Sequence, residues 1–189
     1  MKKAITAFLF LSFSVCLYAQ TLSWDISFLR GRTQESAPIS QIIRMQTGET
    51  FEFSITPNAS AFCYIVFYDS QRKVFVLHNE PLAANAEKIF GPFQLEAPAG
   101  TETIYVIMSL QRQANLERLI QAYNNNTSAT AQANSLYREV VNLQNSVSRL
   151  GEPVSSYIPS GGTTRSAVPR QVTRFSGKDL YVRAISIRH

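Results

Sequence analysis

The sequence predicts a mainly β protein with an α-helical insertion: an antiparallel β-sandwich that carries a helical hairpin and follows an N-terminal signal peptide. Three observations lead to this prediction. Polar and apolar residues alternate in several short stretches, turn residues recur between these stretches, and the pattern switches once to helical spacing. The 189 residues, of which 45% are hydrophobic and 16% charged, have the composition of a globular protein and exclude collagen-like and low-complexity classes.

Alternation is clearest in residues 22–28 and 50–55, where every second residue is apolar. A period of two is typical of a strand with one buried face. Residues 62–68 are instead apolar throughout and rich in aromatic and β-branched side chains, as expected for a central strand buried on both faces. Further strands are expected at 42–45, 74–77, 93–95, 104–108 and 180–187. Turns at short, regular spacing favour an antiparallel sandwich, immunoglobulin-like or related, over parallel βαβ units.

The helical spacing lies at about 110–150, where apolar residues recur at intervals of three and four. An Asn-rich loop at 124–128 divides this region into two helices, and Gly151 provides a stop after the second. We expect the apolar stripe to pack on the partner helix or on a sheet face; a coiled coil with another chain is the alternative. The polar stretch 151–171 is expected to be a long connection, functional or disordered.

The first residues have the three parts of a secretory signal peptide. Lys2 and Lys3 are followed by the nearly uninterrupted apolar stretch 4–15, and the small residue Ala19 provides a cleavage point. Lipidation of Cys16, which would give peripheral membrane attachment, is the alternative, and an uncleaved anchor is a third possibility.

Cleavage after Ala19 divides the chain into a signal peptide, 1–19, and a single domain, 20–189, in the periplasm or outside the cell. No later stretch is long and apolar enough to span a bilayer. Cys63 is then the only thiol, so no internal disulfide can form. The net charge falls from +5 to +3, because Lys2 and Lys3 leave with the signal. From Ser160 onward six bases stand against one acid, so the basic character is local and is poor evidence for a nucleic-acid partner.

Few residues of this chain could carry catalysis. Cys63 lies within a predicted strand and is expected to be buried, His189 is expected to be frayed, and His78 follows a strand without any nucleophile motif near it. Closely spaced metal ligands are also lacking. We therefore predict no catalytic, cofactor-binding or metal-binding residue and no enzyme activity.

Two alternatives remain open, a small secreted hydrolase and a carbohydrate-binding module. The first would use His78 or a pair of carboxylates, although each carboxylate is expected to be a solvated surface group. The carboxylate candidates are Glu49, Glu52, Asp69, Glu80, Glu96 and Glu102. The second would use exposed aromatic residues as a platform, for which Tyr123, Tyr137 and Tyr157 are the candidates.

The run GETFEFSITPNASAFCYIVFYDSQRKVFVLHNEP, followed by FQLEAPAGTETIYVIMS, resembles the bacterial domain-of-unknown-function family 4384 over residues 48–109. The shared features are turns and core strands: a Tyr-rich buried strand, a D-S-x-x-x-V turn and a P-x-G-x-E turn. The chain departs from the family pattern at His78, where an aromatic residue is usual, and at Pro81, which comes late. The resemblance implies a secreted or modular non-catalytic domain and transfers no catalytic residue.

These observations predict a non-catalytic, exported cell-envelope protein that acts as a binding or interaction module. The basic, Gly-rich segment of the long connection is the predicted contact surface, together with the helical face. The expected partner is an envelope protein or an anionic envelope polymer, and no nucleic acid. The predicted contact residues are Gly161, Gly162, Thr163, Thr164, Arg165 and Arg170.

Overall fold

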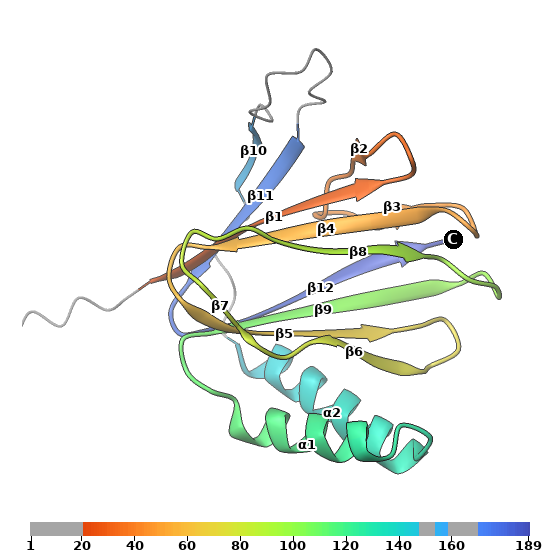
Figure 1. Cartoon of the computed structure of the whole chain (residues 1–189), viewed down its shortest axis with the longest axis vertical. Helices are drawn as coiled ribbons and strands as arrows, with labels where there is room; N and C mark the ends of the chain where they lie inside the picture. The colour runs from red at the N-terminus through yellow and green to blue at the C-terminus, as the bar shows by residue number, and fades with distance from the viewer. Residues whose placement is uncertain (1–20, 148–153, 159–169) are drawn as a thin grey trace, which may run out of the picture.

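The computed structural model describes residues 21–147, 154–158 and 170–189, which form two open β-sheets and two packed helices (Figure 1). The mainly β class and the helical insertion are therefore confirmed. The predicted signal peptide, with Cys16 and the cleavage point after Ala19, lies outside the described residues. Neither described helix is long and apolar enough to cross a membrane.

The first sheet has six strands and is antiparallel throughout. Its order is β10 (Val154–Ile158), β11 (Arg170–Gly177), β1 (Leu22–Arg30), β4 (Thr50–Pro57) and β8 (Lys88–Gln94), while β2 (Glu35–Ser36) pairs with β1. The alternation in β1 places Leu22, Trp24, Ile26 and Phe28 in the core, each at most 1% exposed. Trp24 lies opposite Phe175 of β11, with ring centroids 4.9 Å apart.

The second sheet also has six strands but is mixed. Its order is β3 (Ile43–Arg44), β12 (Leu180–Arg188), β9 (Thr101–Ser109), β5 (Ala61–Tyr68) and β6 (Val74–His78), while β7 (Pro81–Leu82) pairs with β5. The parallel pair is β3 with β12, so the expectation of purely antiparallel sheets is wrong for this sheet. The two strands are far apart in the sequence, and thus no hairpin fixes their relative direction.

The hydrophobic core lies between the inner faces of the two sheets, and strand β5 shows how the second sheet separates it from the helices. Cys63 and Ile65 point into the core shared with β1 and β4, whereas Tyr64 and Val66 belong to a second apolar cluster on the helix side. This arrangement confirms the prediction that residues 62–68 are buried on both faces, because a strand side chain points alternately to either side.

Helices α1 (Ala114–Asn125) and α2 (Thr130–Ser146) cover the outer face of the second sheet (Figure 1). The buried residues Leu116, Ile120, Leu136 and Val140 pack in one cluster with side chains of β5, β9 and β12. The predicted stripe is therefore used within the chain. Helix α2 ends at Ser146, before the predicted end near Leu150, which itself lies outside the described residues.

Four strands were not expected from the sequence: the two-residue strands β2 and β7, and the longer strands β10 and β11. The stretch predicted as a long connection contains β10 at 154–158, and β11 lies in the middle of the first sheet, between β10 and β1. Strand β11 carries Arg170 and Arg174 and buries Thr173 next to Val172, so its alternation is broken. Its place in the sheet comes from backbone pairing on both sides, which leaves little trace in hydropathy.

Candidate functional site

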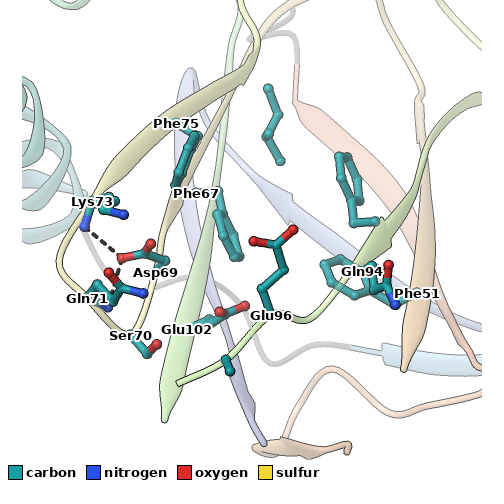
Figure 2. Close-up of a pocket in the computed structure, with 13 residues that line it drawn as sticks. Phe51, Phe67, Asp69, Ser70, Gln71, Lys73, Phe75, Gln94, Glu96 and Glu102 are labelled. Carbon is teal, nitrogen blue, oxygen red and sulfur yellow. Dashed lines mark hydrogen bonds between the residues drawn. The ribbon is translucent and has the colours of Figure 1, made fainter. Parts of the chain in front are cut away.

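A pocket of about 290 Å³ opens between the last strands of the two sheets, and we call it the edge pocket (Figure 2). Among the described strands, each sheet ends at the pocket in a strand with one neighbour, β8 in the first sheet and β6 in the second. Side chains of the inner faces are therefore left uncovered between these two strands. The lining residues are Phe51, Phe67, Asp69, Ser70, Gln71, Lys73, Phe75, Leu77, Phe93, Gln94, Glu96, Ala97 and Glu102.

Aromatic rings form the walls of the edge pocket. Phe67 and Phe75 come from the second sheet, with ring centroids 6.0 Å apart, and Phe51 and Phe93 come from the first, with centroids 5.3 Å apart. Phe51 is only 2% exposed, whereas Phe75 is 43% exposed and lies on the rim. The walls thus run from the hydrophobic core to the surface.

Three carboxylates and one ammonium group complete the lining, which is acidic as a whole. Asp69 uses Oδ1 to accept the backbone N–H groups of Gln71 and Lys73, at 2.8 and 2.7 Å, and so fixes the turn between β5 and β6. Glu96 is exposed, and Figure 2 shows its side chain reaching into the pocket between Phe67 and Phe51. Glu102 is 5% exposed and is the buried member of the three.

Glu102 lies on the inner face of β9, at the end of the core. Its Oε1 is 3.3 Å from Nε2 of His189, whose Nδ1 is 3.0 Å from the hydroxyl of Thr47. Its Oε2 is buried and has no hydrogen-bond partner. Burial raises the pKa of Glu102 above its usual range, and attraction to His189 offsets part of this rise.

Two sequence-based expectations are wrong here. His189 is not frayed: its side chain is wholly buried, and its backbone exchanges two hydrogen bonds with Gly100, at 2.9 and 3.0 Å. Glu102 is not a solvated surface acid, since the alternation of β9 turns it toward the core with Ile104. The acid, imidazole and hydroxyl lie in a row, but the imidazole has no exposed surface at which a substrate could reach it.

His78 lies at the end of β6, away from this row, with its ring edge-on to Phe90 at a centroid distance of 5.2 Å. Its Nε2 is buried without a partner, and burial lowers its pKa while Glu80 offsets part of the change. Cys63 is fully buried, and burial raises the pKa of its thiol. Within the described ranges no three His, Cys, Asp or Glu side chains are grouped closely enough to hold a metal ion.

Of the predicted contact residues the structure describes Arg170 alone, which does not line the edge pocket. Arg170 begins β11 and pairs with Glu87, Nη1 to Oε1 at 3.1 Å. Gly161, Gly162, Thr163, Thr164 and Arg165 lie outside the described residues, so the predicted contact surface stays a prediction for them.

Of the six carboxylate candidates, Asp69, Glu96 and Glu102 meet at the edge pocket. Glu49 instead accepts the N–H of Gln46 in a turn, at 2.9 Å.

The aromatic platform is corrected in part. Tyr123 is buried, 7% exposed, and its hydroxyl donates to the carbonyl oxygen of Val74, so it is not a surface residue. Tyr137 is half-buried and stacks on Tyr68 with ring centroids 4.3 Å apart. The side chain of Tyr157 lies outside the described part of the chain.

Sequence reasoning did not find the edge pocket itself. Its residues come from β4, β5, β6, β8, β9 and the turns between them, and only the strand order brings these together. The signal that could have indicated it is the Phe content of the predicted strands, with 12 Phe in the chain.

The fold and the pocket define a mainly β protein of two open sheets with a helical pair on one outer face and an aromatic, acidic pocket at one pair of edges. In comparisons with known proteins, no protein-family model, no curated protein and no solved structure matches the chain. The resemblance to family 4384 therefore stays a prediction.

Proposed function

We propose that this chain is a non-catalytic, exported cell-envelope protein that acts as a binding module, and that its ligand site is the edge pocket. Export to the periplasm or the exterior is inferred from residues 1–19 alone. We take the two sheets to be a β-sandwich of immunoglobulin-like or related architecture, which holds the pocket walls in place. The observation that carries the proposal is the aromatic lining, which leaves Phe75 43% exposed between two open strands.

The size and character of the pocket suit a side chain or a small group of a larger ligand. Its volume of about 290 Å³ is close to the lower limit of small-molecule sites. Apolar walls with a few polar groups are typical of such sites, and exposed aromatic residues are typical of protein contacts. Exposed Phe75 lies on the pocket rim and extends the apolar surface outward.

An envelope protein fits the edge pocket better than an anionic envelope polymer. Asp69, Glu96 and Glu102 line the pocket against a single base, Lys73, so an anion would be repelled. A polymer partner would have to bind elsewhere, at the basic segment that includes Arg165. Arg170 already pairs with Glu87, which reduces its availability for such a ligand.

Retention on the host's own cell envelopes tests the proposal. The 20–189 chain is mixed with isolated envelopes, and the sedimenting fraction is compared between the unaltered chain, Phe75→Ser and Ile42→Ser. Ile42 is 48% exposed, similar to Phe75, but does not line the pocket, so it is the matched control. We expect retention to fall with Phe75→Ser and to stay with Ile42→Ser. Equal retention of the two variants would rule out the edge pocket as the site.

The basic segment is tested in the same assay with Arg165→Glu and Arg170→Glu. Weaker retention of these variants, with Phe75→Ser unaffected, would move the site to the predicted contact residues. Binding of an anionic envelope polymer would then replace protein binding as the proposed function.

A second candidate, the small secreted hydrolase or carbohydrate-binding module, is favoured by one observation. Glu96 and Glu102 share the pocket, and burial raises the pKa of Glu102, as the general acid of a glycosidase requires. A glycan panel tests this candidate. Binding or cleavage of a glycan that is lost in Glu102→Gln would favour it over protein binding.

A further inference from the structure

The two strands that border the edge pocket differ in their capacity to accept another strand. In β8, Pro92 has no N–H group, Gly91 has a φ of +113°, and the register with β4 shifts between Phe51 and Phe53. Proline and bulges are common protections of sheet edges. Strand β6 carries no proline and pairs with β5 alone among the described residues. Of the two border strands, β6 therefore lacks these protections; at its first residue the hydroxyl of Tyr123 in α1 donates to the carbonyl oxygen of Val74.

The side chains of β6 already alternate between two environments. Phe75 and Leu77 line the edge pocket, whereas Val74 and Val76 belong to the apolar cluster on the helix side. A peptide strand paired with β6 would continue this alternation and place every second side chain on the pocket side. The pocket therefore lies where a side chain of an added strand would enter it.

The polar groups of the pocket select the kind of side chain that enters. Glu102 lines the pocket and is 5% exposed, and its Oε2 is buried without a hydrogen-bond partner. Glu96 also lines the pocket, and its side chain reaches into it (Figure 2). A buried acceptor without a donor is best satisfied by a charged N–H group, and rings such as those of Phe67 and Phe75 attract cations.

Lysine and arginine combine an apolar stem with a cationic head, which matches aromatic walls that end at carboxylates. We propose, on the basis of the function proposed above, that the edge pocket takes a lysine or arginine side chain of an extended peptide segment that adds to β6 as a further strand. The backbone of the partner pairs with β6, its apolar stem lies against the Phe rings, and its charged head donates to Glu102.

The test uses nine-residue peptides, acetylated and amidated, that alternate threonine and glutamine around one central residue. The central residue is lysine, arginine, norleucine or glutamate, and affinity for the 20–189 chain is measured by NMR titration. Norleucine keeps the stem of lysine and removes its charge. We expect the lysine and arginine peptides to bind at least about tenfold more tightly than the norleucine peptide, and the glutamate peptide not to bind.

Variants of the protein identify the group that recognises the charge. Glu102→Gln is expected to reduce the lysine-to-norleucine ratio to about one, because the amide keeps the shape and removes the charge. Glu52→Gln is the matched control, since Glu52 follows the pocket residue Phe51 on β4 but does not itself line the pocket. The ratio should be unchanged in this variant.

Backbone pairing is tested with N-methylated lysine peptides. Methyl groups on one alternate set of amides should abolish binding, and on the other set should leave it largely intact, because only every second residue of an added strand bonds to the edge. Equal effects of the two sets would overturn strand addition.

Two further results would overturn the inference. If the norleucine peptide binds as tightly as the lysine peptide, the pocket takes an apolar group and not a charged one. If none of the peptides binds, no strand is added to β6. The proposed function is judged separately by envelope retention, which can still depend on Phe75 when either of these results is found.

Discussion

Oε1 of Glu102 lies 3.3 Å from Nε2 of His189, and the two side chains are 6% and 0% exposed. Glu102 lies in β9, where it is the partner of Ile187, and His189 directly follows the adjacent strand β12. The other ion pairs of the described residues each include a side chain at least 46% exposed. The pair of Glu102 and His189 therefore holds the carboxylate of the edge pocket in an orientation set by buried contacts.

The first prediction concerns the coupling between these two residues. Glu102→Gln and His189→Gln should each lower the free energy of unfolding by about 1–3 kcal/mol, since each leaves a buried polar partner poorly satisfied. The double variant should lose less than the sum of the two, because the second substitution removes a partner that is already lost. Urea unfolding of the four proteins measures the coupling energy.

The exposed pair of Arg30 and Glu35 provides the control for this cycle. Glu35 is 61% exposed, so the coupling energy of the pair should be about 0–1 kcal/mol. A coupling of Glu102 with His189 no larger than this value would contradict the role assigned to the buried pair.

The second prediction concerns pH. Burial lowers the pKa of His78 below its ordinary value of 6.5, so the unfolded chain binds a proton at a higher pH than the folded chain. The contribution of His78 to stability is present above the unfolded pKa and falls as the pH drops through it, until the folded pKa is reached. We expect the unfolding free energy to fall less between pH of about 8 and about 5.5 in His78→Gln than in the unaltered chain.

Glu102 should act in the opposite direction in the same experiment. Its pKa is raised above the ordinary value of 4.5, so its contribution is present at low pH and is lost as the pH rises through the folded pKa. The unfolding free energy of the unaltered chain should therefore include a decrease as the pH rises through the folded pKa of Glu102, and this decrease should be absent in Glu102→Gln. Identical pH dependence of His78→Gln and the unaltered chain would contradict the effect assigned to burial of the imidazole.

The third prediction concerns the start of helix α1, which has no side-chain cap of its own at Gln113. The hydroxyl of Tyr64 accepts the N–H of Gln113 at 3.1 Å and donates to Glu117 at 2.7 Å. Burial raises the pKa of Tyr64 to about 12, so the hydroxyl keeps its proton at neutral pH. Tyr64→Phe should lower the free energy of unfolding by about 1–2 kcal/mol, which urea unfolding would measure.

Tyr68→Phe is the matched control for this substitution. Tyr68 lies on the same strand and stacks on Tyr137, a contact that phenylalanine retains. Its effect should be clearly smaller than that of Tyr64→Phe. Equal effects would indicate that the hydroxyl of Tyr64 contributes nothing to the attachment of α1.

Much of the fold could be predicted from the sequence, because one-sided burial leaves a period in the residues that carry it. Strand β1 and helix α1 were predicted for this reason, from the alternation of Leu22 to Phe28 and from the spacing of Leu116 and Ile120. Strand β11 was not predicted, because its buried and exposed side chains do not alternate regularly. Its place in the sheet comes from backbone pairing on both sides.

The candidate site could not be predicted in the same way. Glu102 and His189 are 87 positions apart in the sequence and meet only because β9 and β12 are neighbours. Phe75 and Phe93 both had the appearance of core residues, and only the order of the strands places them at an opening. Sequence periodicity reports which face of a strand is buried, but not which strand ends a sheet.

The last prediction concerns Cys63, whose thiol is fully buried within β5, with its pKa raised by burial. Only the thiolate reacts with alkylating agents, so labelling of the folded 20–189 chain by iodoacetamide should be slow. A Ser128→Cys variant adds an exposed thiol in the loop between the helices and provides the comparison. Mass spectrometry should show labelling of Cys63 at least about 100-fold slower than labelling at position 128, and equal rates in denaturant. Rapid labelling of Cys63 in the folded chain would mean that β5 opens readily, and the walls of the edge pocket, which include Phe67 of the same strand, would then not be fixed.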